Sequence, residues 1–159
     1  MPSSVYVETS VVSYLAARPT SDLVTDARRR LTHAWWSARR LAFDLVTAQP
    51  VLDEAGAGDP GAAARRLAYL AGLPLVDVTL EAVALAVVLD RTARLPARAA
   101  ADALHIALAA VHGVDYLLTW NMRHIANAEL RPAIEAACRR AGYTPPVIAT
   151  PDALMGGSR

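Results

Sequence analysis

The chain has 159 residues, a length typical of one domain, and we expect a single domain over residues 1–159. Hydrophobic residues make up 54% of it and charged residues 19%, which excludes an intrinsically disordered chain. Its 16 basic residues, all arginine, nearly balance 15 acidic ones, so the net charge of +1 excludes nucleic-acid binding through bulk charge alone. The arginines are nevertheless clustered, at 28–30, 39–40, 65–66 and 139–140, which allows a local basic surface.

The single cysteine, Cys138, excludes an internal disulfide and a multi-cysteine zinc site, and we expect a buried thiol there. The first residues lack the basic start of a signal peptide. Apolar runs such as 82–89 fall far short of the ~20 residues that cross a bilayer. We therefore expect a cytoplasmic protein with no membrane segment.

Strand and helix patterns alternate along the first half of the chain. In the segment 8–10, the hydroxyls of Thr9 and Ser10 suit a helix N-terminus. Pro50 suits a first helical turn, and Asp59 followed by Pro60 indicates a capped helix start. In chain order, these signals predict a strand at 5–7, a helix at 11–17, a helix from about 23 to 40, a strand at 43–47, a helix from 50 to Gly56 or Gly58, and a helix from 60 to about 71.

The second of these helices carries two adjacent tryptophans, Trp35 and Trp36. Adjacent helical positions cannot both lie on one buried stripe, so one ring is predicted to be exposed and available to a partner. The flanking arginines, 28–30 and 39–40, form either a solvated helix face or a face for a protein partner or an RNA backbone. The predicted apolar stripe consists of Leu23, Ala27, Leu31, Ala34, Trp35 and Ala38.

The second half continues the alternation of strands and helices. Gly72, Gly113 and Gly142 each follow a predicted helix as its C-terminal stop. The predicted elements are strands at 75–78, 116–119 and 147–149, and helices at 80–91, 97 or 99 to 112, and 129–141. Strands that alternate with helices indicate a parallel sheet covered by helices. We therefore predict an α/β protein of three layers, α/β/α, with a central parallel sheet of four to five strands.

Several polar side chains are predicted to meet at one edge of this sheet. In open parallel sheets, ligands bind at the carboxyl ends of the strands. Glu8 ends the first strand, and Asn121 follows the fourth. Glu54 lies on the helix after the second strand, and Asp102 lies near the start of the helix that leads into the fourth. Asp115 precedes the fourth strand and is predicted to lie at the opposite edge.

Carboxylate and amide oxygens are the ligands that Mg²⁺ and Mn²⁺ prefer. The alternative is that Glu8 and Asp102 cap helices and that Glu54 is a solvated surface residue. Against it, Asp102 begins an almost wholly apolar helix and Glu8 follows an apolar strand, and a buried carboxylate is costly without a partner or an ion. Asp53 competes with Glu54, but adjacent helix residues point about 100° apart, so only one faces the site easily.

Four segments of the chain resemble the signature segments of PIN-domain ribonucleases, most closely the VapC-type toxins of bacterial toxin–antitoxin pairs. They occur in the family's order, and the resemblance covers nearly the whole chain. The segments are 5–10 (VYVETS), 51–54 (VLDE), 101–107 (ADALHIA) and 117–121 (LLTWN).

The resemblance implies a single PIN domain over residues 1–159 that acts as an endoribonuclease with Mg²⁺ or Mn²⁺ as cofactor. It implies that the catalytic and metal-binding set consists of Glu8, Glu54, Asp102 and Asn121. The supporting hydroxyls would be Thr9, Ser10 and Thr119. Glu8 stands where the family usually has an aspartate and Asn121 is neutral, which predicts one firmly held metal ion, with a second either recruited by the substrate phosphate or absent. The resemblance also implies a cognate antitoxin that masks the activity, and a homodimer.

Three further residues lie near this set. His105 shares a helix face with Asp102, and we expect a core histidine bonded to a neighbour rather than a ligand of metal or RNA. Arg123 and His124 follow Asn121 and are either RNA contacts or ordinary surface residues.

The predicted function is therefore metal-dependent hydrolysis of RNA phosphodiester bonds by the toxin of a toxin–antitoxin pair. One alternative is a catalytically weak PIN-like module that binds RNA or protein. Another is a metal-dependent DNA nuclease or phosphatase.

Overall fold

The computed structural model describes residues 1–92 and 99–156. It contains a five-stranded sheet of order β3-β2-β1-β4-β5, in which all neighbouring strands are parallel. The predicted parallel sheet is therefore confirmed. The strands are β1 (Ser4–Val7), β2 (Asp44–Ala48), β3 (Leu75–Val76), β4 (Tyr116–Leu118) and β5 (Val147–Ala149).

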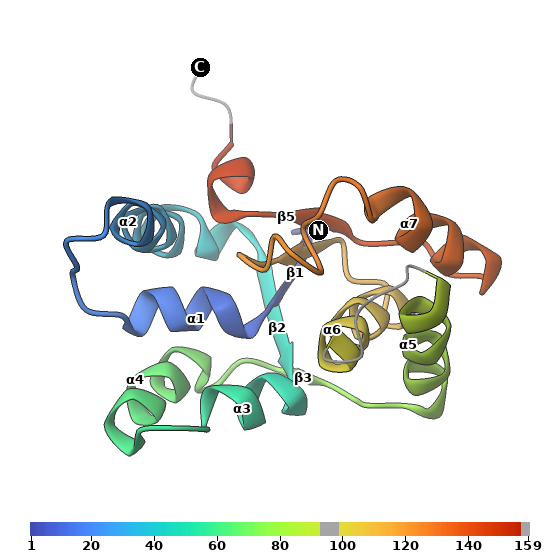
Figure 1. Ribbon diagram of the computed structural model, residues 1–159, viewed down its shortest axis with the longest axis horizontal. Coiled ribbons are helices and arrows are strands. Elements are labelled where there is room, and N and C mark those ends of the chain that lie inside the picture. The colour runs from blue at the N-terminus through green and yellow to red at the C-terminus, as the bar shows by residue number, and fades with distance from the viewer. Residues whose placement is uncertain (93–98, 157–159) are drawn as a thin grey trace.

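Helices cover both faces of this sheet. They are α1 (Thr9–Ala16), α2 (Leu23–Ala38), α3 (Gln49–Ala55), α4 (Pro60–Leu70), α5 (Leu80–Thr92), α6 (Ala100–Val111) and α7 (Arg131–Arg140). Helices α1–α4 lie on one side of the strands and α5–α7 on the other, which gives the three predicted layers (Figure 1). Short 3₁₀ helices occupy Arg40–Ala42 and Pro151–Leu154. The alternative start of the sixth helix at residue 97 lies outside the described residues.

The strand order creates a switch point between β1 and β4. From β1 the chain builds outward through β2 to β3, and then crosses to β4 on the other side of β1. Val5 pairs with Leu45 on one side and with Tyr116 on the other, so β1 is central. In sheets of this kind, ligands bind outside the carboxyl ends of the strands where the order reverses. The residues that follow Val7 and Leu118 therefore lie where a site is expected.

The start and end of α4 illustrate how local sequence signals set the helices. Asp59 is the N-cap, and its side chain accepts a hydrogen bond from the Ala62 N–H. Pro60 occupies the first turn, where its missing N–H costs nothing. After the helix, Gly72 adopts a φ of +81°, a conformation that residues with a Cβ rarely adopt.

The apolar stripe predicted for α2 is wrong. Leu23 is 85% exposed and Leu31 is 38% exposed, and of the six predicted members the structure buries only Trp35. Trp36, which was not in the stripe, is also buried, so neither tryptophan is free for a partner.

Packing on two sides of α2 explains why both tryptophans are buried. Trp35 stacks on Phe43 at a centroid distance of 5.8 Å, and its Nε1–H donates to the Leu154 carbonyl at 3.2 Å. Trp36 meets Tyr69 of α4 edge to face. Because neighbours lie on both sides, adjacent helical positions can both be buried.

Two expectations about the chain's chemistry concern Cys138 and membranes. Cys138 is fully buried in α7, as predicted, and burial raises the pKa of its thiol to about 11. In residues 1–92 and 99–156, no helix is both long enough and apolar enough to cross a membrane.

We predict that Trp35→Ala lowers the free energy of unfolding by about 3–5 kcal/mol, because it opens a cavity in the core. The matched control is Leu23→Ala, which alters another member of the predicted stripe. Since Leu23 is largely exposed, we expect a change within about 0.5 kcal/mol. Urea unfolding of both variants measures the difference, and equal losses would contradict the packing of α2.

Candidate functional site

Glu8 follows β1 directly, and its side chain is buried with 4% exposure. Its carboxylate accepts the Ser10 N–H at 2.6 Å and thereby caps α1. Burial raises the pKa of Glu8 and outweighs this hydrogen bond and the nearby charge of His105, which lower it. Within the described part of the chain, Glu8 has no ion-pair partner within 4 Å. The capping role considered for Glu8 is confirmed, and its charge is left without a direct counter-charge.

Glu54, near the end of α3, is held by two hydrogen-bond donors. His105 Nε2 lies 2.7 and 3.0 Å from its two carboxylate oxygens, and Thr9 Oγ1 donates to Oε2 at 2.9 Å. Burial raises the pKa of Glu54, but the hydrogen bonds and the charge of His105 lower it overall. The neighbouring Asp53 is exposed and accepts from Gln49 at 2.8 Å. Of the two adjacent acids, Glu54 is therefore the one that faces inward.

His105 of α6 is fully buried and joins Glu54 to Tyr6 of β1. A carboxylate only accepts, so Nε2 carries the proton shared with Glu54, and in the neutral ring Nδ1 accepts from the Tyr6 hydroxyl at 2.7 Å. Burial lowers the pKa of His105, but the bond to Glu54 and the charges of Glu54, Glu8 and Asp102 raise it overall. The expected core histidine bonded to a neighbour is confirmed, and three carboxylates act on it.

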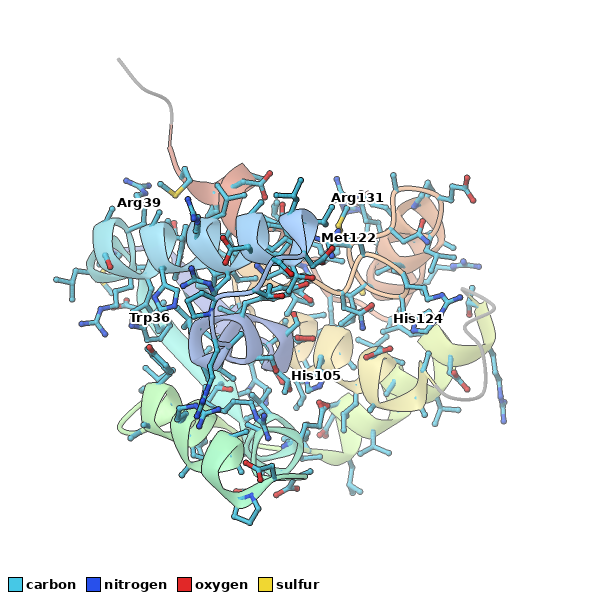
Figure 2. All side chains as sticks on the ribbon, turned by 60° about the vertical axis from the view of Figure 1, so that its left-hand side comes forward. Trp36, Arg39, His105, Met122, His124 and Arg131 are labelled. Atoms are coloured by element: carbon cyan, nitrogen blue, oxygen red, sulfur yellow. The ribbon has the colours of Figure 1, made fainter. Side chains whose placement is uncertain are left out.

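Asp102 lies in the first turn of α6 and accepts from His124 Nδ1 at 2.9 Å. Both side chains are 20% exposed. The N-cap of α6 is Ala99, so the capping alternative for Asp102 is wrong. His124 also donates its backbone N–H to Asn121 Oδ1 at 3.0 Å, so its side-chain bond to Asp102 ties this turn after β4 to α6. Figure 2 labels His105 and His124.

The hydroxyls of the segment after β4 and of α1 form a network. Ser10 Oγ accepts the Trp120 N–H at 2.7 Å and lies 3.4 Å from Thr119 Oγ1. Thr119 Oγ1 accepts the Asn121 N–H at 2.9 Å. Among the three expected supporting hydroxyls, that of Thr9 reaches a carboxylate, whereas those of Ser10 and Thr119 fix the loop that carries Asn121.

Two features of this site were missed by sequence reasoning. Tyr6 reaches His105 from β1, and its only sequence signal is a tyrosine inside a short apolar strand. The second missed feature is Arg28 of α2, whose Cζ lies 5.5 Å from the centroid of the Trp120 ring. By contrast, the predicted Arg123 is exposed, and its guanidinium makes no ion pair with any described residue. The sequence marked Arg28 only as one of three consecutive arginines.

The donor set fits a hard divalent cation in its chemistry. The available ligands are carboxylate oxygens, and the Glu8 carboxyl is buried with no ion-pair partner within 4 Å among the described residues. The side chains are not gathered into a ready-made site: within residues 1–92 and 99–156, no group of three or more His, Cys, Asp or Glu side chains is placed to hold a metal ion. The carboxylates of Glu54 and Asp102 are instead turned to His105 and His124.

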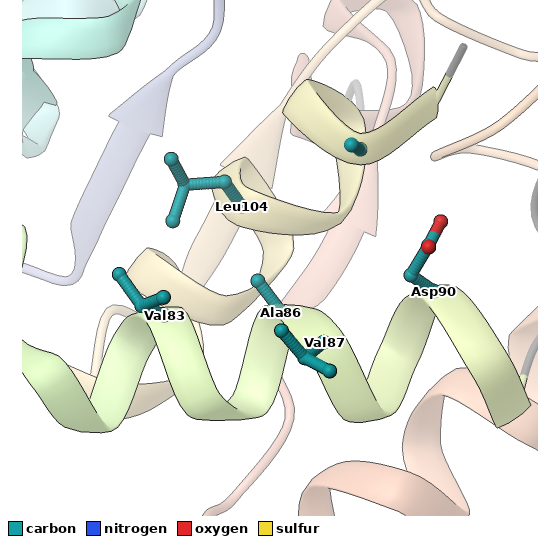
Figure 3. Close-up of a pocket in the computed structure, with 6 residues that line it drawn as sticks. Val83, Ala86, Val87, Asp90 and Leu104 are labelled. Atoms are coloured by element: carbon teal, nitrogen blue, oxygen red, sulfur yellow. The ribbon is translucent and has the colours of Figure 1, made fainter. Parts of the chain in front are cut away.

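A separate apolar pocket of about 210 Å³ lies between α5 and α6 (Figure 3). Its lining contains none of the acids expected to act in catalysis. It is formed by Val83, Ala86, Val87, Asp90, Ala100 and Leu104. The candidate site is therefore distinct from this pocket.

Comparisons of the chain with protein-family models, with curated proteins and with solved structures found no match. A function for the chain has to be inferred from the side chains described above and from the four sequence segments.

We predict that Glu8→Gln raises the free energy of unfolding by about 1–3 kcal/mol at pH 7 without divalent metal. Glutamine keeps an acceptor for the Ser10 N–H and removes the buried charge. Because the folded-state pKa of Glu8 is raised, its contribution to stability is full below the ordinary pKa of a glutamate and is lost as pH rises through the folded-state value. The difference between variant and parent should therefore vanish near about pH 4.

Denaturant unfolding of both proteins at the two pH values measures this difference. Glu129→Gln, at an exposed position, is the control and should leave stability unchanged. A Glu8→Gln protein that is less stable than its parent at pH 7 would show that the buried charge is compensated.

Proposed function

We propose that the protein is a divalent-metal-dependent endoribonuclease of PIN type that acts as the toxin of a toxin–antitoxin pair. The observation that carries the proposal is the burial of the Glu8 carboxyl at the end of the central strand, with no ion-pair partner within 4 Å among the described residues. Glu8, Glu54 and Asp102 come from three separated segments of the chain. A buried carboxyl without a counter-charge is unfavourable for folding alone, and such groups are typical of sites that bind a cation or perform chemistry.

Mg²⁺ or Mn²⁺, when bound, supplies an activated water and neutralises negative charge on a phosphodiester. The three carboxylates and the amide oxygen of Asn121 would hold it. Ser10 prepares Glu8 for this role, because its N–H fixes one carboxylate oxygen. His105 likewise holds Glu54, because its Nε2 lies 2.7 and 3.0 Å from the two carboxylate oxygens. Residues that hydrogen-bond to the metal ligands and fix their orientation are a regular part of metal sites.

Arg123 and His124 are assigned to the RNA backbone in this proposal. Both follow β4 at the edge where the acids lie, and Arg123 is exposed. His124 donates Nδ1–H to Asp102, and in the protonated imidazolium its Nε2–H would also be available to donate to a phosphate oxygen.

The proposal includes a cognate antitoxin and a homodimer, with the protein in the cytoplasm. A protein partner is supported by the exposed apolar side chains of α5, two of which line the pocket shown in Figure 3. Contiguous exposed apolar side chains are typical of protein interaction surfaces. The exposed residues are Leu80, Val83, Val87 and Val88.

We predict that the purified protein cleaves RNA with Mg²⁺ or Mn²⁺ and not with EDTA. Glu54→Gln and Asp102→Asn should each lower kcat/KM by about 100-fold, because each removes a charged ligand. Asp53→Asn is the matched control: it changes the adjacent carboxylate, which faces Gln49, and should cleave like the parent. Gel assays of labelled single-stranded and hairpin RNA measure all four proteins.

Cleavage that survives both Glu54→Gln and Asp102→Asn would overturn the assignment. DNA and small phosphoesters, offered to the same preparation, separate a ribonuclease from a DNA nuclease or a phosphatase.

A catalytically weak module that binds RNA or protein is the second candidate. It is favoured by the engagement of Glu54 and Asp102 by histidines. Under that alternative, RNA binding survives while metal-dependent cleavage is absent.

A further inference from the structure

The three consecutive arginines of α2, residues 28–30, make different side-chain contacts. Arg29 Nε lies 3.0 Å from one oxygen of Asp26, and Arg30 Nε lies 2.8 Å from the other. The hydrogen bond from Arg29, with the charges of both arginines, lowers the pKa of Asp26. Both oxygens of this carboxylate are thus engaged. Arg28 has no ion-pair partner within 4 Å among the residues that the structure describes.

Arg28 points away from Asp26, toward aromatic and sulfur groups. Its Cζ lies 5.5 Å from the centroid of Trp120, Nη1 lies 3.5 Å from the Tyr14 hydroxyl, and Nη2 lies 3.6 Å from the Met122 Sδ. A phenol and a thioether are weak acceptors for a guanidinium with five N–H groups. The group is therefore positioned by three side chains while much of its donor capacity is unused.

The hydrogen bonds from Thr25 are the main cause that lowers the pKa of Asp22, and the charge of Arg28 lowers it further. That effect is the smallest of those acting on Asp22, because its side chain is engaged at the start of α2. It accepts the Thr25 N–H at 3.1 Å and the Thr25 hydroxyl. Asp22 therefore does not neutralise Arg28 by direct contact.

Trp120, whose ring Arg28 contacts, is connected by hydrogen bonds to the candidate site. Trp120 is 8% exposed, and its Nε1–H donates to Thr32 Oγ1 at 2.8 Å. Its backbone N–H donates to Ser10 Oγ, and the Ser10 N–H donates to Glu8. Arg28 is thus two hydrogen bonds and one ring contact away from Glu8, at the rim of the candidate site.

We propose that Arg28 binds a phosphodiester group of the RNA substrate beside the scissile bond. An acidic site repels a polyanion, so its rim needs fixed positive charge, and the planar guanidinium binds two phosphate oxygens at once. Stacking on Trp120 holds the group in place before RNA arrives. This inference rests on the proposed function for its choice of ligand.

The test compares Arg28→Gln with Arg30→Gln on the same helix. Arg30 carries the same charge but is paired with Asp26, and its side chain is 76% exposed. Binding of a labelled single-stranded RNA is measured by fluorescence anisotropy in EDTA, where no cleavage is expected, at several salt concentrations. We expect Arg28→Gln to weaken binding about tenfold and to lower the salt slope by about 0.7, while Arg30→Gln stays near the parent.

Arg28→Lys separates charge from geometry, and it should recover part of the lost affinity. Thermal unfolding of each variant checks that the fold is intact. Equal losses for Arg28→Gln and Arg30→Gln would overturn the inference, because they would show a general charge effect. So would an Arg28→Gln protein that binds RNA normally and loses binding only to an acidic peptide.

The outcomes separate this inference from the proposed function. If the parent binds RNA through Arg28 but never cleaves it, the binding of an RNA phosphodiester by Arg28 stands, and the nuclease proposal fails together with the placement beside a scissile bond. If the parent cleaves RNA with metal and Arg28→Gln changes neither the Kd nor the KM, the inference fails and the nuclease proposal stands.

Discussion

Burial of the Glu8 carboxylate at the end of the central strand is the constraint on which the site depends. The Glu8 N–H donates to the Leu118 carbonyl, and the side chain caps α1 through Ser10. One residue therefore ends β1, joins it to β4 and starts the next helix. Because burial raises the pKa of this carboxyl, its charged form is costly to the fold. The placement has a structural role as the N-cap of α1, and the cost of its charged form is what the proposed cation would offset.

The same charge balance accounts for the two histidines among the acids. Carboxylates that meet at one sheet edge repel one another, and each of two histidines donates a hydrogen bond to one of them. His105 is locked on Glu54 and Tyr6 in the core, whereas His124 is partly exposed on Asp102. A divalent cation that enters this site would share the carboxylates with the imidazoles rather than find them free. This arrangement also explains why the acids do not form a ready-made metal cage among the described residues.

The alternation of strands and helices was enough to predict the parallel sheet, and helical geometry together with the resemblance favoured Glu54 over Asp53. The contact between Tyr6 and His105 could not be predicted, because the two residues are 99 positions apart and meet only when α6 packs on the sheet. The separate orientation of Arg28 depends on where neighbouring helices place their aromatic rings. Local pattern thus predicts elements and edges, whereas side-chain partners across elements require the packed fold.

Anomalous diffraction from crystals grown with Mn²⁺ tests the central claim most directly, since it locates the metal without reliance on activity. We expect an anomalous peak within bonding distance of carboxylate oxygens of Glu8 and Glu54, with Asp102 directed at it. A structure with saturating Mn²⁺ but no peak at this edge, and with Glu54 still held by His105 and Thr9 as described above, would contradict a metal-dependent site.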